Sequence, residues 1–320
     1  MRHARIRPRD TDTFMHVFNR VVGSAKDYPF DPPEKEYFIN LMRDLTRLYT
    51  VEIVAYQLMG NHFHLLVFVP GACLSAADAA ARFNRYYDGK RVIEPNSPKA
   101  EALPAKLRDI SAYLHALQQG FSRWYNRTRS SRRRGHLWAE RFKNTILEGG
   151  ISVWHCWQYI ELNCVRARLV PRPEDYRFGS WGAWAGTGKH PFEDSVRQRV
   201  LPTLPPEMGI HDLGGLHYAL RRNLAVAAAS ARQQPAPDAA PVGRSAGKER
   251  FSTRVDRRVR YWADGLVIGS EIFVKTVVAR ARGELAVRKR RLIRALHAAD
   301  ETSAAAPPAL YSFKQLRQIV

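Results

Sequence analysis

The sequence predicts an α+β fold of the split β-α-β (ferredoxin-like) type: an antiparallel sheet with helices on one face, plus a small basic C-terminal module. Two observations support this prediction. Segments with strand and helix patterns follow one another in the order β-α-β-β-α-β-α. In addition, 45% of the 320 residues are hydrophobic, enough to build a core beneath such a sheet.

Four segments are rich in β-branched and aromatic residues, which is typical of strands. They are FMHVFNRVV at 14–22, VEIVAYQL at 51–58, HFHLLVFV at 62–69 and RFKNTILEG at 141–149. Only Met-Gly-Asn separates the second from the third, so these two are expected to form a hairpin.

Three longer segments have the pattern of helices. Residues 33–49 begin with Pro and acidic residues and carry apolar side chains at helical spacing. Residues 109–128 and 151–170 are the other two, and the segment 71–108 is expected to hold a helix followed by a loop.

Composition divides the chain into three parts. Residues 1–200 are expected to form a catalytic domain, and residues 201–250 a linker, because the sequence from about residue 225 is rich in Ala, Pro, Ser and Gly. Residues 251–320 form the basic module, with an ordered segment at 258–278 and a basic helix at 288–299. Its Arg288–Arg291 run is interpreted either as phosphate contacts or as a solvated helix face.

The charge balance points to a polyanionic partner. Lys and Arg number 51 against 30 Asp and Glu, a formal net charge of +21, and nucleic acid is the commonest polyanion. The alternative is a soluble protein from an Arg-rich genome. Three cysteines without a C-x-x-C pair argue against a disulfide framework or structural zinc. With no signal peptide or apolar span, we expect a cytoplasmic, nucleoid-associated protein without a membrane partner.

His62 and His64 are the first candidates for chemistry. Side chains alternate along a strand, so these two imidazoles face the same side while Phe63 turns into the core. Neutral imidazole is a common ligand of divalent metals. The alternative is a pair of ordinary surface histidines.

Tyr159 and Asn163 are the second pair of candidates. Residues four apart share one helix face, so a phenol and an amide oxygen lie one turn apart. The alternative is a core tyrosine followed by an asparagine that caps the helix.

A basic, aromatic stretch at 121–143 is the third candidate feature. Guanidinium groups can neutralise phosphates while aromatic faces stack on unpaired bases, so the stretch predicts nucleic-acid binding. The alternative is a solvated basic helix end. The predicted DNA-binding residues are Arg123, Arg127, Arg132, Arg133, Arg134, Trp138, Arg141 and Lys143.

Together these motifs resemble a known family. M-x-N-H-x-H-L-L at 59–66, G-H-L-W-x-x-R-F-K at 135–143 and Y-I-x-L-N-x-V-R-A-x-L-V at 159–170 are similar to single-tyrosine insertion-sequence transposases, and most similar to the REP-associated tyrosine transposases. The resemblance covers roughly residues 12–190. It implies a His-hydrophobic-His nuclease that cuts and rejoins single-stranded or hairpin-flanked DNA through a 5′-phosphotyrosine.

The resemblance also implies roles for individual residues. Tyr159 would be the nucleophile, and His62, His64 and Asn163 would hold Mg²⁺ or Mn²⁺. Two departures concern the end of the helix: Cys164 replaces the Pro of the family pattern and Arg168 replaces its Gly. Glu161 stands where related proteins often have His, and it is expected to point away from the site.

Two rival functions stay open. One is a domesticated, non-catalytic regulator that binds hairpin DNA, and the other is a metal-dependent hydrolase that uses water in place of tyrosine. A structural zinc protein is a more distant alternative. The sequence does not choose between a monomer and a homodimer.

Overall fold

The computed structural model of the chain describes most of the first 232 residues and short segments beyond them. The described residues are 10–23, 29–129, 135–232, 262, 266–283, 293–295 and 311–313. None of the described helices combines the length and apolar content needed to cross a bilayer.

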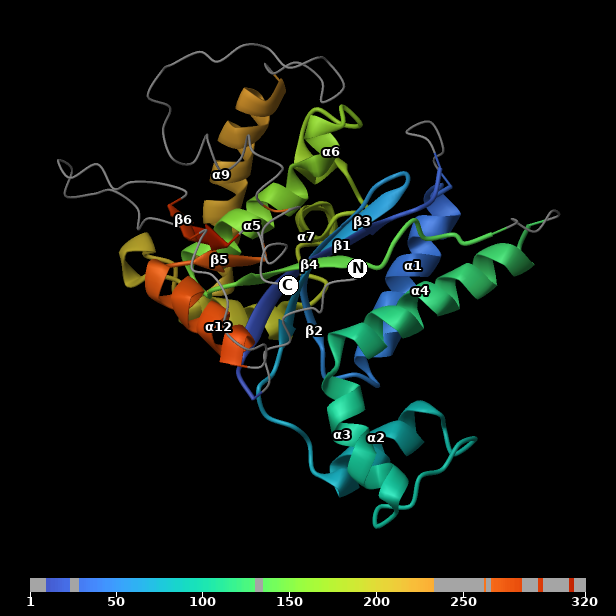
Figure 1. The fold of residues 1–320 in the computed structure, drawn as a ribbon. Helices are drawn as coiled ribbons and strands as arrows, with labels where there is room; N and C mark the ends of the chain where they lie inside the picture. The colour runs from blue at the N-terminus through green and yellow to red at the C-terminus, as the bar shows by residue number, and fades with distance from the viewer. Residues whose placement is uncertain are drawn as a thin grey trace.

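The elements of the first part of the chain follow the predicted order (Figure 1). They are β1 (Thr13–Arg20), α1 (Pro32–Thr46), β2 (Glu52–Leu58), β3 (His62–Val69), α2 (Ala76–Tyr86), α3 (Pro98–Arg108), α4 (Ile110–Arg127), β4 (Lys143–Leu147), α5 (Ile151–Glu161) and α6 (Asn163–Arg166).

Short helices and a final set of small strands follow. They are η1 (Pro173–Asp175), α7 (Ser180–Thr187), α8 (Glu193–Ser195), η2 (Val196–Val200), η3 (Leu201–Thr203), η4 (Pro206–Met208), α9 (Leu213–Arg232), β5 (Val267–Gly269), α12 (Glu271–Gly283), β6 (Ile293–Ala295) and β7 (Tyr311–Phe313).

The central sheet confirms the predicted fold class. The described strands form one seven-stranded sheet in the order β2-β3-β1-β4-β5-β7-β6. The first four strands, β2-β3-β1-β4, are antiparallel to one another, and β1 lies between β3 and β4, as the split β-α-β arrangement requires.

One detail of the predicted architecture is wrong, because helices cover both faces of the sheet. On one face the Phe63 ring of β3 lies 5.1 Å from the Phe38 ring of α1. On the other face the His64 ring lies 5.7 Å from the Tyr159 ring of α5. Figure 1 shows the strands between α5 and α9 on one side and α1 and α4 on the other. Phe63 and His64 face different helices because neighbouring side chains alternate along a strand.

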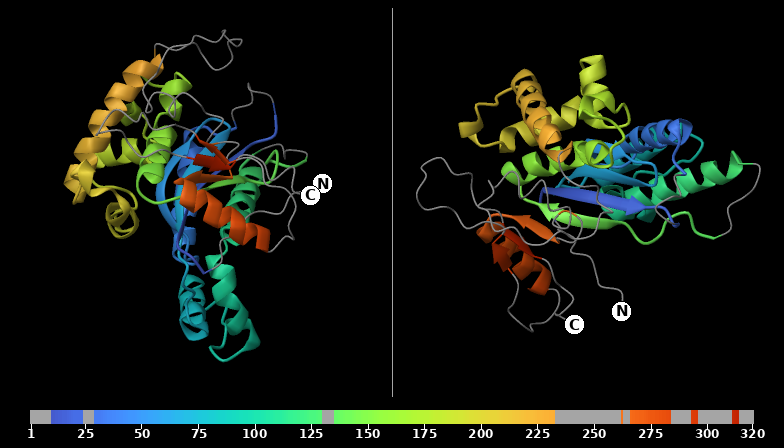
Figure 2. Two further views of the ribbon diagram at one scale, coloured as in Figure 1. Left: turned by 60° about the vertical axis from the view of Figure 1, so that its left-hand side comes forward. Right: turned by 90° about the horizontal axis from the view of Figure 1, so that it is seen from above.

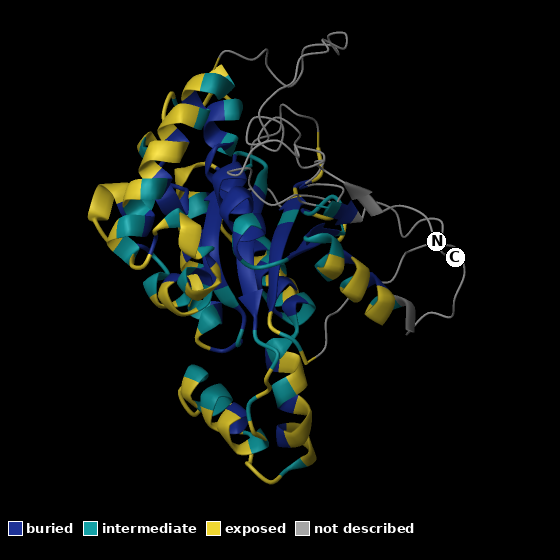
Figure 3. Cartoon of the chain, turned by 90° about the vertical axis from the view of Figure 1, so that its left-hand side faces the viewer, coloured by how far each residue is buried: buried dark blue, intermediate teal, exposed yellow. Residues whose placement is uncertain are grey.

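The segment between β3 and α4 contains more helix than predicted. After α2 it forms a second helix, α3, which starts after Ser97, whose hydroxyl accepts from the amide of Ala100 at 3.2 Å. The α2–α3 pair extends away from the sheet (Figures 1 and 2), and its outer surface is exposed while the strands are buried (Figure 3).

The predicted linker at 201–250 begins too early. Residues 213–232 form the helix α9, whose Leu216, Leu220 and Leu224 are fully buried at helical spacing. Residues 233–250 lie outside the described residues. An Ala-rich composition is common in linkers, but alanine also has the highest helix propensity.

The C-terminal segment extends the sheet. β5 pairs in parallel with β4, and the amide of Glu148 donates to the carbonyl of Ile268 at 3.0 Å. Ser270 caps α12 by accepting from the amide of Phe273, and Glu148 accepts from the Ser270 hydroxyl at 2.9 Å. The helix predicted at 288–299 is wrong at 293–295, which form β6; its other residues, including Arg288–Arg291, lie outside the described residues.

The helix predicted at 151–170 is divided at Leu162 into α5 and α6. The two departures from the family pattern, Cys164 and Arg168, lie in α6 and just after it. The Cys164 amide donates to the Gln57 side chain at 3.1 Å, a bond that a proline could not make. Arg168 has φ +57°, and the amides of Arg168 and Leu169 donate to the carbonyls of Val165 and Cys164, both at 2.9 Å. This is a Schellman motif, in which glycine normally takes the left-handed position.

We therefore predict that Arg168→Gly raises the free energy of unfolding by about 1 kcal/mol, because glycine adopts positive φ without the Cβ clash. Arg168→Ala is the matched control, since it removes the side chain and retains the clash. Chemical denaturation of both variants measures the difference. Equal stability of the two variants would show that the backbone at residue 168 is not strained.

Candidate functional site

The site is built on the sheet face that α5 covers. The β1–β3 register pairs Phe18 with His64 and Arg20 with His62, so these side chains share that face. The β1–β4 register adds Lys143, opposite Phe18. The predicted orientation of the two histidines is confirmed: their rings lie 5.2 Å apart, with Phe63 on the opposite face.

A third histidine, which the sequence analysis did not identify, lies beside this pair. His16 of β1 is fully buried, and its Nε2 lies 2.9 Å from His64 Nδ1. Its other nitrogen, Nδ1, lies 3.1 Å from the backbone carbonyl oxygen of Trp262. Thr145 donates its hydroxyl to the same carbonyl at 3.1 Å. No local pattern in the sequence marks His16, because its partner His64 lies 48 residues away.

Tyr159 meets the histidines from α5. Its ring lies 5.7 Å from the rings of both His16 and His64, in edge-on orientation. The indole of Trp262 stacks on the phenol ring, with the ring centroids 5.7 Å apart. Tyr159 is only 1% exposed, so the phenol is enclosed by the sheet and the C-terminal segment.

Burial sets the protonation of the site. It lowers the pKa of His16 to about 4, and burial together with Arg20 lowers the pKa of His62 to about 4. Burial also brings the pKa of His64 well below its usual value. The three imidazoles are therefore neutral at pH 7, the state in which imidazole binds a metal.

The phenol of Tyr159 is held in its protonated form. Burial raises its pKa to about 12, and the nearby charge of Arg166 partly opposes this shift. The Arg166 guanidinium lies 5.0 Å from the centre of the Tyr159 ring and donates to the Tyr159 carbonyl at 2.9 Å. Arg166 belongs to the V-R-A part of the motif at 159–170, and the motif alone does not indicate its contact with the Tyr159 ring.

The donor groups fit a divalent metal in part. The Nδ1 of His62 lies 2.7 Å from the Asn61 side-chain oxygen, which can only accept, so His62 Nε2 keeps its lone pair. Asn163 follows Tyr159 by one turn, and its amide nitrogen donates to the carbonyls of Tyr159 and Ile160. Among the described residues, no three His, Cys, Asp or Glu side chains form a metal-binding group. The predicted set has only two side chains of these types, His62 and His64, because its third member is the asparagine Asn163. The absence of a group of three therefore does not contradict it.

Glu161 points away from the site, as expected. Its carboxylate accepts from Trp157 Nε1 at 3.2 Å and from the amide of Trp181 at 3.1 Å. Glu161 therefore links α7 to α5, and its side chain does not lie on the Tyr159 face of α5.

The predicted DNA-binding stretch is divided between the two faces of the sheet. Arg123 and Arg127 are exposed on α4, which packs on the face opposite Tyr159. Arg141 and Lys143 are exposed beside β4, and Lys143 Nζ lies 5.9 Å from the Phe18 ring on the Tyr159 face. The central part of the track, Arg132, Arg133 and Arg134, lies outside the described residues.

Several of the interleaved aromatic residues take part in internal packing. Trp138 lies 5.6 Å from Phe63, and its indole nitrogen donates to the Gln118 carbonyl at 3.1 Å. Trp124 stacks on Tyr37 at 4.0 Å, and Phe121 is fully buried. Base stacking by Trp138 remains a prediction. The internal contacts of Trp138, Trp124 and Phe121 are by themselves enough to explain why aromatic residues recur in this stretch.

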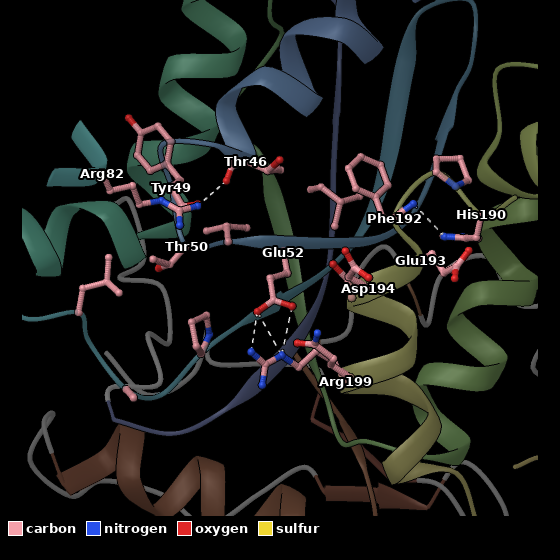
Figure 4. Close-up of a pocket in the computed structure, with 18 of the residues that line it drawn as sticks. Thr46, Tyr49, Thr50, Glu52, Arg82, His190, Phe192, Glu193, Asp194 and Arg199 are labelled. Atoms are coloured by element: carbon pink, nitrogen blue, oxygen red, sulfur yellow. Dashed lines mark hydrogen bonds and ion pairs between the residues drawn. The ribbon is translucent and has the colours of Figure 1, made fainter. Parts of the chain in front are cut away.

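A groove of about 830 Å³ lies at the opposite end of β2 and β3 from His62 (Figure 4). Its two arginines and Glu52 are already engaged: Arg199 donates to both oxygens of Glu52, and Arg82 donates to the carbonyls of Thr46, Leu48 and Tyr49. The groove is separate from the histidine and tyrosine cluster.

We predict that Trp262→Ala makes the Tyr159 phenol accessible to reagents. Nitration by tetranitromethane, mapped by mass spectrometry, should leave Tyr159 unmodified in the unaltered protein and modify it several-fold more in the variant. Tyr113 is the control, because it is fully buried under a different part of the fold and should stay unmodified in both proteins. Nitration of Tyr159 to the same extent in both proteins would contradict the enclosure by Trp262.

The chain is similar to a solved structure but to no protein-family model. No protein-family model matches the chain, and neither does any curated protein. Among the solved structures that are similar is one described as "Structure of the REP associates tyrosine transposase bound to a REP hairpin". It is 14% identical with a TM-score of 0.39, over 60% of this chain and 89% of that chain.

Proposed function

We propose that the protein is a metal-dependent, single-tyrosine DNA nuclease and strand transferase that acts on single-stranded DNA next to a hairpin. The observation that carries the proposal is the placement of the Tyr159 ring 5.7 Å from His64, which shares its face of the sheet with His62. Elements from distant parts of the sequence thus bring a candidate nucleophile to two neutral imidazoles.

In the proposed reaction, the phenol oxygen of Tyr159 attacks the scissile phosphorus. A bond forms between this oxygen and phosphorus, and the bond between phosphorus and the 3′ oxygen breaks. The phenol loses its proton, and the leaving 3′ oxygen gains one. The products are a 5′-phosphotyrosine and a free 3′-hydroxyl. Mg²⁺ or Mn²⁺ held by His62, His64 and Asn163 would supply Lewis acidity toward the phosphate.

The positive charges around the site support a phosphate-containing substrate. Arg20 and Lys143 are exposed on the same sheet face as the histidines, and Arg166 lies against the Tyr159 ring. Positive groups around a cleavage site bind the phosphates of a strand without reading its bases. We therefore propose that the strand crosses the Tyr159 face of the sheet.

One observation favours a second candidate function, a non-catalytic protein that binds hairpin DNA. Tyr159 is enclosed beneath Trp262, and its raised pKa makes the phenol a weak nucleophile at pH 7. Tyr159 is only 1% exposed, so a phosphate can reach the phenol only after a rearrangement around it. A covalent protein–DNA adduct distinguishes the two functions.

We predict that Tyr159→Phe abolishes this adduct and leaves DNA binding intact, because only the phenol oxygen is removed. The assay combines a labelled single-stranded oligonucleotide carrying a hairpin with Mn²⁺ and denaturing electrophoresis; a chelator should prevent the adduct. Tyr125→Phe, on α4, is the matched control and should form the adduct normally.

Three other results would contradict the assignment. An adduct formed by Tyr159→Phe would mean that another residue is the nucleophile. Metal-dependent cleavage without any adduct would indicate a hydrolase that activates water. Binding without cleavage in the unaltered protein would support the non-catalytic function.

We also predict different salt dependences for basic residues on the two faces. Lys143→Ala should weaken binding and flatten the slope of log K against log salt by about 0.7, the value for one phosphate contact to a single strand. Arg123→Ala, on the opposite face, should leave the slope unchanged. If only Arg123→Ala flattens the slope, the DNA crosses the α4 face and the proposed path is wrong.

A further inference from the structure

Three polar groups form a hydrogen-bonded chain that runs from the C-terminal segment to His64. The first is the carbonyl of Trp262, the second is His16, and the third is His64. The rings of His16 and His64 lie within 12° of parallel with centroids 5.1 Å apart, which suits a hydrogen bond near the plane of both rings.

The chemistry of the Trp262 carbonyl determines the direction of this chain. A carbonyl oxygen only accepts, so His16 must carry its proton on Nδ1. A neutral imidazole has one N–H, so Nε2 of His16 has a lone pair and accepts. His64 must then donate from Nδ1, and its Nε2 is left with a lone pair.

We infer that His16 is a positioning residue that, together with the carbonyl of Trp262, fixes the tautomer of His64 so that Nε2 is the free acceptor nitrogen. The use of that nitrogen for a metal rests on the proposed function, but the tautomer does not. Partners of this kind commonly orient metal-binding histidines and raise their basicity.

The burial of these hydrogen bonds explains how His16 can fix the tautomer of His64. His16 and Thr145 are at most 1% exposed and His64 is 5% exposed, so bulk water does not compete for the hydrogen bonds. The Trp262 carbonyl receives both His16 and Thr145, and both nitrogens of His16 are engaged. His16 therefore supports the site and does not serve as an additional ligand.

The tautomer can be measured directly in the full-length, metal-free protein. Two-bond ¹H–¹⁵N correlation spectra near neutral pH distinguish the Nδ1–H form of a histidine from the Nε2–H form. We expect His64 in the Nδ1–H form. An Nε2–H form in the unaltered protein would overturn the inference, whatever the variants do.

Two substitutions test the role of His16. A glutamine amide oxygen has about the reach of the imidazole Nε2, so His16→Gln should keep an acceptor and the Nδ1–H form of His64. His16→Leu removes the acceptor, and His64 should move toward Nε2–H. Trp262→Phe retains the backbone carbonyl and should leave the tautomer unchanged. An unchanged tautomer in a folded His16→Leu protein would overturn the inference.

Calorimetric titration with Mn²⁺ separates this inference from the proposed function. We expect a roughly 10- to 100-fold loss of affinity in His16→Leu and recovery in His16→Gln, the range for residues that orient metal ligands. If Mn²⁺ fails to bind the unaltered protein while His64 is Nδ1–H, the metal function fails and the inference stands. If Mn²⁺ binds all the variants equally, His16 does not position the ligand and only the proposed function stands.

Discussion

The pairing of β1 with β3 is the constraint on which the site depends. Eight residue pairs join the two strands, from Thr13 opposite Val69 to Arg20 opposite His62. Side chains alternate along a strand, so a shift of β3 by one residue against β1 would turn His64 toward α1, away from His16, and bring Phe63 against Tyr159. The register therefore decides at once which face holds the apolar core against α1 and α4 and which face holds the histidines against α5.

The polar face carries an energetic cost that its hydrogen bonds offset. A buried polar group without a partner costs roughly 1–3 kcal/mol. His16 avoids this cost by bonding through both nitrogens, and His64 avoids it through His16. The same dry surroundings keep the imidazoles neutral and the Tyr159 phenol protonated. The arrangement thus favours metal binding by the histidines while it lowers the nucleophilicity of the tyrosine.

The sequence predicted the parts of the site that depend on local periodicity. The strand at 62–69 and the shared face of His62 and His64 are confirmed, because alternation along a strand needs no knowledge of distant residues. His16 and Trp262 are not predictable in the same way, because their contacts span 48 and 246 residues. No local pattern marks such partners. The aromatic residues of 121–143 predict a base-stacking surface, but the half-buried ring of Trp124 already stacks on Tyr37.

The distance in sequence between Tyr159 and Trp262 has a consequence for the timing of synthesis. At about 5–20 residues per second, a ribosome adds the roughly 100 intervening residues in about 5–20 s. During that interval the nascent chain already contains the strands, the histidines and Tyr159, but His16 lacks the carbonyl that orients it. The carbonyl that orients His16 is therefore added to the chain only after all the other groups of the site.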